Sequence, residues 1–453
     1  MTVTVDRARL ARLTARERAA YASRHPGSAR AFRAAARPLL GGVPMTWMRM
    51  WPGGFPLYLA TARGARLTDI DGNEFTDFCL GDTGAMAGHS PAAVQEAVSV
   101  RYRDLGGAAT MLPTQDAAWV AAELARRFKV ASWSFTLTAT DANRWAIRLA
   151  RQLTGRPRIA VFSYCYHGSV DETFIVAGPD GPRPRDGNVG PPADPRQTTR
   201  VAEFNDLAGL ERELAPGDVA AVLMEPALTN IGIVLPAPGY LAAVRALTRE
   251  HGCLLINDET HTFSAGPGGC TLAWDLDPDM VTIGKSIAGG IPAGAYGLTA
   301  ELAARILADQ HADIIDSGGV GGTLAGNALS VAAMRATLEH VLTDAAFAAM
   351  ISLASRYTAG VRQVIAGHGL PWHIVQLGAR AEYRFCPEPP RTGGQAAAAA
   401  DPLLDEYLHL YLVNRGVLLT PFHNMALMSP ATTSQDVAAH TAVFAAAAAE
   451  LAG

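Results

Sequence analysis

Short apolar runs alternate with helical periods from about Leu67 onward, a pattern typical of βαβ units around a largely parallel sheet. The runs that predict strands are Trp133–Leu137, Arg158–Ser163, Ala220–Met224, Cys253–Asn257 and Met280–Ile283. A helix is predicted near residues 140–154, where Ala142, Trp145, Ala146, Leu149 and Leu153 share one face. A second helix is predicted from Tyr240 to Glu250. The pattern therefore predicts a large α/β domain.

The rest of the chain follows a different pattern. Beyond residue 326, a long helical period leads into helices interrupted by two short strands, near Glu382–Phe385 and Val417–Thr420, which indicates a second, α+β domain. The Ala-rich runs at 396–400 and 445–449 predict a loop and a terminal helix. The stretch Gly178–Gln197 is dense in Pro, Gly and Asp, so we expect a surface loop there, either a plain connection or a functional lid.

Composition narrows the classes of function. With 49% hydrophobic and 18% charged residues, the chain has the profile of a well-buried globular protein. The net charge of −4 gives no basic field for nucleic acid or an anionic membrane, so we expect neither as a partner. No stretch approaches the roughly 18 apolar residues of a membrane span, and Met1–Arg37 lacks an apolar signal segment. We expect a soluble, cytoplasmic protein whose five scattered cysteines are buried thiols, not disulfides or zinc ligands.

Lysine is rare in this chain. Only Lys129 and Lys285 are present, against 36 arginines. A composition bias of this kind replaces Lys by Arg wherever a positive charge is enough. A lysine that remains is a candidate for one whose amine is needed, because guanidinium stays protonated and does not form an imine. Lys129 lies in a surface-like run of basic residues, so its presence can be due to chance. The count therefore draws attention to Lys285.

A carboxylate and this lysine follow two successive strands. Asn257-Asp258-Glu259 ends an apolar run, and Lys285 comes about 27 residues later, after Met280–Ile283. Ligands of α/β sheets bind at the carboxyl ends of the strands. Pyridoxal 5′-phosphate chemistry needs such a pair, an amine to hold the cofactor as an imine and an anion to keep the pyridine nitrogen protonated. An Asp after a strand is often only a cap, so the pair carries more weight than either residue.

Two segments of small residues are candidates for phosphate binding. Thr138, Ala139 and Thr140 lie where a strand runs into the helix near 140–154, and a helix N-terminus exposes backbone N–H groups to an anion. The alternative is a simple N-cap with Asp141 in the first turn. The segment Ser317–Thr323 is a second candidate. A third feature is Tyr166, after the strand Arg158–Ser163, whose ring is able to lie on a bound aromatic group.

Taken together, these segments resemble a class III aminotransferase of the pyridoxal-phosphate fold type I, close to glutamate-1-semialdehyde aminomutase and the β-amino-acid aminotransferases. The resemblance runs from Gly64 to about Leu427. The matching pieces are Gly64–Asn73, Ala146–Arg151, Thr154–Arg156, Cys165–Gly168, Glu225-Pro226, Pro236–Leu241 and Gly322–Asn327.

The resemblance implies a role for each candidate residue. Lys285 would form the Schiff base and shuttle a proton, and Asp258 would pair with the pyridinium nitrogen. Tyr166 would stack on the ring. The remaining cofactor contacts would come from Thr138, Ala139 and Thr140 at the phosphate, Thr323 reaching it from a neighbouring subunit, and Glu225 near O3′. The active enzyme would then be a homodimer.

The resemblance also implies the domain organisation. Residues 1–75 and 326–453 would form a small α+β domain from both termini, and residues 76–325 a large cofactor-binding domain with a mostly parallel sheet. No metal is implied.

The sequence departs from the family pattern in three places. The phosphate loop has Ala139 and Asp141 where Gly and Glu are usual, and Thr260 replaces a Val that packs behind the ring, so its hydroxyl needs a partner. His261 then follows, as a group that orients Asp258 or as a structural histidine. The stretch Thr420–Asn424 has no carboxylate-binding Arg.

Arg49 is the remaining candidate for that carboxylate, and Trp47 for an apolar substrate pocket, unless both simply pack the small domain. The leading expectation is an aminotransferase that passes an amino group, through pyridoxamine 5′-phosphate, from an amino acid or amine to a keto acid. Apolar, aromatic and β-amino acids are candidate donors. The alternative is an intramolecular 2,1-aminomutase of the glutamate-1-semialdehyde kind. A racemase, a non-catalytic cofactor-binding protein and a nucleotide enzyme are weaker alternatives, the last because no GxGxxG or P-loop pattern is present.

Overall fold

The computed structural model describes residues 5–188, 194–308 and 322–452, and the chain divides into two compact units. Unit 1 comprises Met1–Pro91, Ala348–Pro389 and Ala399–Gly453, and unit 2 comprises Ala92–Phe347 and Pro390–Ala398. The sequence predicts domain boundaries at 75/76 and 325/326. In the structure, the chain passes from one unit to the other at 91/92 and 347/348. Both ends of the chain belong to unit 1.

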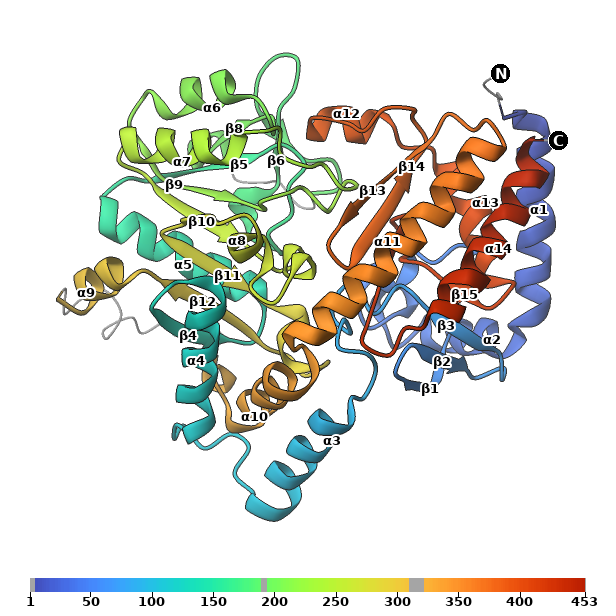
Figure 1. Ribbon diagram of the computed structural model, residues 1–453, viewed down its shortest axis with the longest axis horizontal. Coiled ribbons are helices and arrows are strands. Elements are labelled where there is room, and N and C mark those ends of the chain that lie inside the picture. The colour runs from blue at the N-terminus through green and yellow to red at the C-terminus, as the bar shows by residue number, and fades with distance from the viewer. Residues whose placement is uncertain (1–4, 189–193, 309–321, 453) are drawn as a thin grey trace. The chain divides into compact units, whose positions relative to one another are not determined.

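Unit 2 is built on a seven-stranded sheet, in the order β4-β12-β11-β10-β9-β5-β8 (Figure 1). Its strands are β4 (Ser132–Thr136), β5 (Arg158–Phe162), β8 (Thr199–Ala202), β9 (Val219–Met224), β10 (Leu254–Asp258), β11 (Met280–Ile283) and β12 (Gly294–Leu298). Both neighbours of β12 are antiparallel to it, and the other pairs are parallel. The predicted α/β class and mostly parallel sheet are confirmed.

The helices of unit 2 precede the sheet or connect its strands along the chain, apart from the last three. They are α3 (Ala92–Ser99), α4 (Gln115–Phe128), α5 (Ala139–Thr154), α6 (Leu207–Leu214), α7 (Tyr240–Glu250), α8 (Gly269–Ala273), α9 (Ala300–Ala308), α10 (Ala328–Ala336) and α12 (Gly393–Ala398). Helix α5 packs on β9, β11 and β12 because it presents an apolar face that includes Trp145, Ala146 and Leu149. Its first turn begins where β4 ends, at the carboxyl edge of the sheet.

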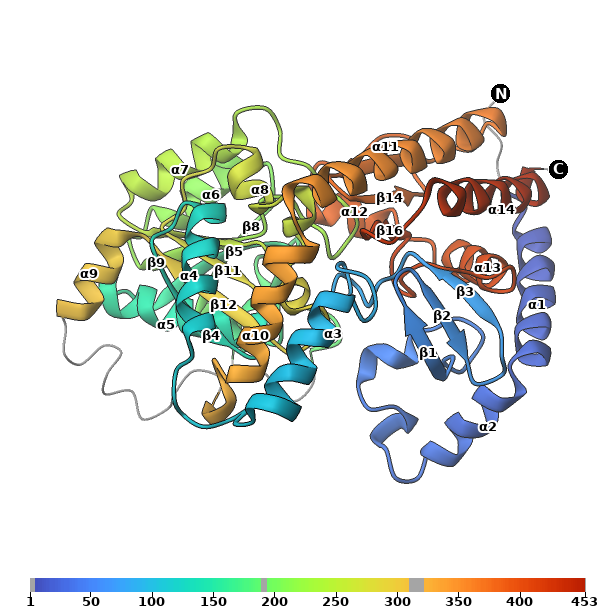
Figure 2. The same ribbon diagram turned by 60° about the horizontal axis from the view of Figure 1, so that its bottom comes forward.

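Unit 1 holds two smaller sheets. One has the order β1-β2-β3-β15, formed by β1 (Leu59–Arg63), β2 (Arg66–Asp69), β3 (Glu74–Asp77) and β15 (Val417–Leu418). The other is β13-β14-β16, formed by β13 (His373–Leu377), β14 (Arg380–Arg384) and β16 (Met425–Leu427). The helices are α1 (Arg7–Arg24), α2 (Pro26–Ala35), α13 (Pro402–Val413), α14 (Ser434–Ala452) and most of α11 (Asp344–Gly367). Figure 2 shows α1, α13 and α14 side by side, and α13 contacts both of the others.

Two predictions for loops need correction. Ala396–Ala398 lie in the short helix α12, not in a loop, because Gln395 and Thr392 begin a helical turn whose Ala396 is buried. The stretch Gly178–Gln197 is not wholly irregular. Its β7 (Arg183–Pro184) pairs with β6 (Ile175–Val176), Pro195–Gln197 form a 3-10 turn, and residues 189–193 lie outside the described part.

Candidate active site

The carboxyl ends of β10 and β11 bring the predicted carboxylate and lysine to one edge of the sheet. The two strands are parallel, and Asp258 is the register partner of Thr282. Lys285 follows three residues after Thr282 and begins the 3-10 turn Lys285–Ala288 with a φ of +52°. A non-glycine residue in this left-handed region costs about 1–2 kcal/mol. The chain thus places the half-buried lysine by a strained turn rather than by a regular element.

Asp258 is 3% exposed and is held by three hydrogen bonds. Its Oδ2 accepts from Asn143 Nδ2 at 2.8 Å and lies 2.8 Å from His167 Nδ1. Its Oδ1 accepts from the backbone N–H of Thr260 at 3.0 Å. A carboxylate offers about four acceptor sites, so these donors leave one site on Oδ1 for a further N–H.

The electrostatics of this pair favour charge on both partners. Burial raises the pKa of Asp258, but the hydrogen bond and charge of His167 outweigh burial, and the pKa lies below its usual 3.8. Burial lowers the pKa of His167, but electrostatic interaction with Cys165 and the hydrogen bond to Asp258 raise it well above 6.5. Asp258 is therefore an anion at neutral pH, backed by a buried imidazolium.

His261 lies against the lysine. Its Nε2 lies 2.8 Å from Lys285 Nζ, and the residue is 6% exposed. The hydrogen bonds of Asp258 described above come from Asn143, His167 and the backbone of Thr260, and a role of His261 in orienting Asp258 stays a prediction. The residue is three positions from Asp258 in sequence, but the chain turns after β10 into the 3-10 turn Thr262–Ala265 and carries the ring toward β11.

Asn143 is the functional residue that the sequence reasoning missed. It lies on α5 and is fully buried, donating to Asp258 and to the carbonyl of His167, while its Oδ1 accepts from Thr282 Oγ1 at 2.6 Å. One amide thus joins three segments that are far apart in sequence. The available signal was an amide on the apolar face of a predicted helix, because a buried polar side chain needs partners.

The N-terminus of α5 supports both interpretations of its small residues. Thr138 is the N-cap, since its Oγ1 accepts from Asp141 N at 3.2 Å and donates to the Asp141 carboxylate at 2.9 Å. Within the described ranges, the backbone N–H groups of Ala139 and Thr140 have no acceptor. They remain available to an anion, with the positive end of the helix dipole behind them.

Two glycines let neighbouring segments approach this helix start. A Cβ on Gly168, whose φ is +77°, would lie 2.0 Å from Thr140 Oγ1, and one on Gly284 would lie 2.8 Å from the Ala139 nitrogen. The hydroxyl of Thr140 is also the acceptor for Ser169 N at 3.2 Å. The Tyr166–Ser169 loop and the residue before Lys285 therefore both lie against the start of α5.

Tyr166 and Glu225 are brought together at the ends of β5 and β9. The backbone N–H of Tyr166 donates to Glu225 Oε1 at 3.4 Å, and Thr229 donates to Glu225 Oε2. Burial raises the pKa of Glu225. Tyr166 is half-buried, and its ring is therefore partly open to a ligand.

Comparison with known proteins places this geometry in a family. The model of the class-III aminotransferases matches residues 50–443. This chain belongs to the class III aminotransferases. A glutamate-1-semialdehyde 2,1-aminomutase of Sorangium cellulosum is 35% identical, over 92% of this chain and 95% of its own length.

Solved class III structures agree with this assignment. A glutamate-1-semialdehyde aminomutase from Pseudomonas aeruginosa, a lysine-to-alanine variant in complex with PMP, has 49% identity and a TM-score of 0.96, with 99% of each chain covered. An omega-transaminase from Sphaerobacter thermophilus has 31% identity and a TM-score of 0.85, covering 95% of this chain and all of its own.

Three predicted site residues of this class III chain belong to short turns outside the large sheet's strands. Trp47 and Arg49 are in unit 1, on the 3-10 turn Thr46–Arg49, where Trp47 packs on Phe422 with ring centroids 4.7 Å apart and Arg49 is exposed. Thr323 lies in the 3-10 turn Gly322–Leu324 of unit 2 and is exposed. Most of the second phosphate candidate, residues 317–321, lies outside the described residues.

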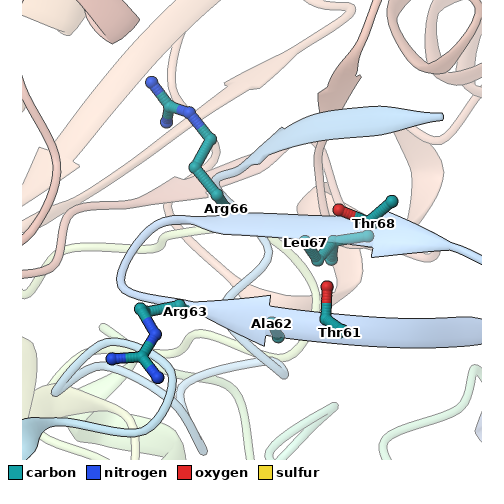
Figure 3. A pocket seen from close by; sticks show the side chains of 6 residues that line it. All are labelled: Thr61, Ala62, Arg63, Arg66, Leu67 and Thr68. Atoms are coloured by element: carbon teal, nitrogen blue, oxygen red, sulfur yellow. The ribbon is translucent and has the colours of Figure 1, made fainter. Parts of the chain in front are cut away.

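A surface depression of about 520 Å³ lies on the β1–β2 hairpin of unit 1 (Figure 3). It is lined by Thr61, Ala62, Arg63, Arg66, Leu67 and Thr68. The guanidinium groups of Arg63 and Arg66 extend to opposite sides of the hairpin, and Arg66 is paired with Asp436. The two arginines therefore do not converge on one anion site. None of the helices in the described ranges combines the length and apolar character needed to cross a bilayer.

Proposed function

We propose that this class III chain transfers amino groups with pyridoxal 5′-phosphate held at the ends of β10 and β11. The observation that carries the proposal is the buried Asp258 carboxylate, kept ionised by His167 at the same sheet edge as Lys285. When bound, this cofactor supplies a protonated pyridine ring that is an electron sink for charge on the neighbouring carbon.

The described residues fit such a group in two respects. Asp258 Oδ1 keeps one acceptor site, which suits the N–H of a pyridinium. The start of α5 offers the backbone N–H groups of Ala139 and Thr140 to a phosphate.

Each residue then has a task. Lys285 would hold the cofactor through Nζ, and its free amine would be the group that carries a proton between carbons. Asp258 would hold the pyridine proton, and Tyr166 would lie against the ring. Glu225 would lie on the O3′ side, where its raised pKa would let it hold or release a proton.

We also propose a homodimer in which Thr323 of the partner subunit completes the phosphate site. The exposed turn of Thr323 precedes α10, whose first residue Ala328 donates its N–H to Ala108 O at 3.0 Å. Three large apolar residues on these chain segments are open to solvent, with exposures of 49% for Leu324, 72% for Tyr102 and 79% for Met111. Exposed apolar residues of this kind favour a protein interface.

Within the class, the proposed reaction is an internal transfer, in which the amino group moves between carbons of one substrate. The relatives at 35% and 49% identity support this choice, since both are glutamate-1-semialdehyde aminomutases. Transfer to a separate keto acid is the second candidate, favoured by the similarity to the omega-transaminase. Trp47 and Arg49 are the proposed substrate contacts in either case.

The cofactor assignment is tested by the absorbance of the purified chain. We expect a yellow protein whose visible band is lost in Lys285→Ala and kept in Lys129→Ala. Lys129 is a matched control, because it is the only other lysine and forms an exposed pair with Asp275 at 2.7 Å. A colourless wild type that added pyridoxal 5′-phosphate does not restore would overturn the proposal.

The reaction is tested by supplying substrates with and without an acceptor. Turnover of glutamate 1-semialdehyde without any keto acid supports the internal transfer. Amino transfer from a panel of donors to 2-oxoglutarate or pyruvate, with no turnover in the absence of these acceptors, would replace it by the second candidate.

A further inference from the structure

The contact between His261 and Lys285 has no part in the functions assigned so far. His261 is only 6% exposed, and its Nε2 lies 2.8 Å from the lysine nitrogen. Both residues follow parallel strands at the same edge, so their distance is set by the register of β10 on β11. The backbone around both is fixed, His261 by the turn after β10 and Lys285 by its left-handed φ.

Other titratable groups of unit 2 at this edge have partners of their own. Asp258 is bound to His167, and Glu225 accepts from Thr229. Glu259 lies among neutral donors, accepting from Thr271 Oγ1 at 2.6 Å and Cys270 N at 3.1 Å. His261 is a titratable side chain within hydrogen-bond distance of Lys285 Nζ.

The chemistry of the two nitrogens permits two arrangements. An ammonium has only donors, so beside it His261 Nε2 accepts and the ring proton lies on Nδ1. A neutral amine has one lone pair, and then a protonated Nε2 donates to it. The two arrangements differ only in which nitrogen carries the proton, and neither requires the atoms to separate.

Ordinary affinities decide when the proton moves. A lysine amine ordinarily binds its proton about four pKa units more tightly than an imidazole does, so the proton moves to the ring only when the amine is drawn into a bond with carbon. Nζ has a lone pair for bonding to carbon only after it has lost that proton. The N–H bond of Nζ therefore breaks as one forms at Nε2, and the positive charge passes to the ring. The neutral amine would then bond to a carbonyl carbon, whose oxygen would leave as water with the two remaining amine protons.

We propose, resting on the function above, that His261 is the positioning residue of Lys285 and receives the proton that the amine loses as it bonds to carbon. The ring holds Nζ in place between cycles and returns the proton when the amine is set free. A leucine at this position would provide neither action. A glutamine would hold the amine through its amide oxygen without accepting a proton.

The first test needs no cofactor and no turnover. Because the chain has two lysines, full-length protein freed of cofactor and labelled with 13C at lysine Cε gives two signals, and Lys129 is the internal reference. We expect the Lys285 signal to move in two steps with pH, one of them at the titration of His261. In His261→Gln the lower step should vanish, while the Lys129 signal stays the same. A Lys285 signal with one step, unchanged by the substitution, would overturn the proposal, and the wild-type titration alone decides if the variant does not fold.

The second test follows the capture of pyridoxal 5′-phosphate by absorbance. We expect His261→Leu to slow covalent capture about 10²-fold, the scale of a lost acid–base group, and His261→Gln to fall between it and the wild type. His340→Gln is the matched control at an exposed histidine and should match the wild type. Equal capture rates in all variants would reduce His261 to a packing residue. Capture by the wild type would still support the proposed function, so the two failures are distinguishable.

Discussion

Asp258 and Glu259 are consecutive carboxylates at the end of β10, and they enter different surroundings. Both are buried, with 3% and 0% exposure. Asp258 meets a basic side chain and an amide, His167 and Asn143. Glu259 meets only neutral donors, the hydroxyls of Thr262 and Thr271 and the backbone N–H groups of Cys270 and Thr271.

The two surroundings move the pKa in opposite directions. Burial raises the pKa of Glu259, and neutral hydrogen bonds do not reverse that rise. For Asp258 burial acts in the same sense, but the charge and hydrogen bond of His167 hold the pKa below its usual value. Nearly equal burial is thus accompanied by pKa shifts of opposite sign. The cationic partner is what favours the charged form of Asp258, and an anion is what a pyridinium would need.

The largest expected difference between the two is in activity. Asp258→Asn removes the anion with little change of shape, so we expect kcat to fall on the order of 10³-fold, as when a preorganised charge contact is lost. Glu259 accepts hydrogen bonds within the turn after β10 and has no assigned role toward the cofactor. In Glu259→Gln, kcat should therefore change by less than about tenfold. Steady-state kinetics on both variants, with circular dichroism as the control for folding, measure this. Equal losses would mean that the charge of Asp258 has no special role.

The next difference is in stability when one partner is removed. His167→Leu leaves the Asp258 anion buried without its cation, which should lower the free energy of unfolding by about 3–5 kcal/mol. Thr271→Val removes one neutral donor from Glu259 and should cost only about 1–3 kcal/mol. Urea unfolding of the cofactor-free proteins gives both values. A larger loss in the threonine variant would reverse the comparison.

Much of the sheet could be predicted from the sequence, because its central strands are continuous apolar runs. Every predicted strand of unit 2 matches an observed one within two residues at each end, and the helix Tyr240–Glu250 has the predicted bounds. Strand β12 was missed because its sequence, Gly-Ala-Tyr-Gly-Leu, has small residues and no β-branched ones. The strands β1–β3 were missed because they are short and partly exposed, and pairing defines them better than local pattern does.

The site was predictable where chain position alone determines it. Asp258 and Lys285 follow from the rule that strand ends converge at one sheet edge. The partners of Asp258 were not predictable in this way, because Asn143 and His167 are more than 90 residues from it in sequence. The contact of His261 with Lys285 was not predicted, since closeness in sequence gives no direction for a side chain after a turn. The roles of Trp47, Arg49 and Thr323 stay predictions.

A smaller effect on stability is expected from substitutions that disturb the packing around Glu259. Gly269 has a φ of +61°, and a Cβ there would lie 2.3 Å from Glu259 Oε2. Gly155 has a φ of +67° with no atom within 4 Å of its Cβ position. Gly155→Ala should therefore cost only the left-handed penalty, about 1–2 kcal/mol, and Gly269→Ala a further 1–3 kcal/mol for the displaced carboxylate. Thermal unfolding of the two variants compares them, and equal shifts would show that Glu259 moves freely.

The smallest effect is the dependence of stability on pH, and its sign differs between the two carboxylates. Asp258 has a folded pKa below 3.8, so its contribution is present above that value and is lost as pH falls through the folded pKa. Glu259 has a folded pKa above 4.5, so the native state keeps its proton longer and loses relative stability as pH rises from 4.5 through the folded pKa. His167, with a pKa well above 6.5, stays charged across this window.

Unfolding measured from pH 3 to 6.5 on the wild type, Asp258→Asn and Glu259→Gln separates these contributions. Relative to Asp258→Asn, the wild type should weaken toward the acid end, and relative to Glu259→Gln it should weaken toward the neutral end. Each slope is limited to about 1.4 kcal/mol per pH unit, the value for a single proton. Slopes of the same sign would mean that the two carboxylates share one charge state, and His167 would then not be what keeps Asp258 ionised.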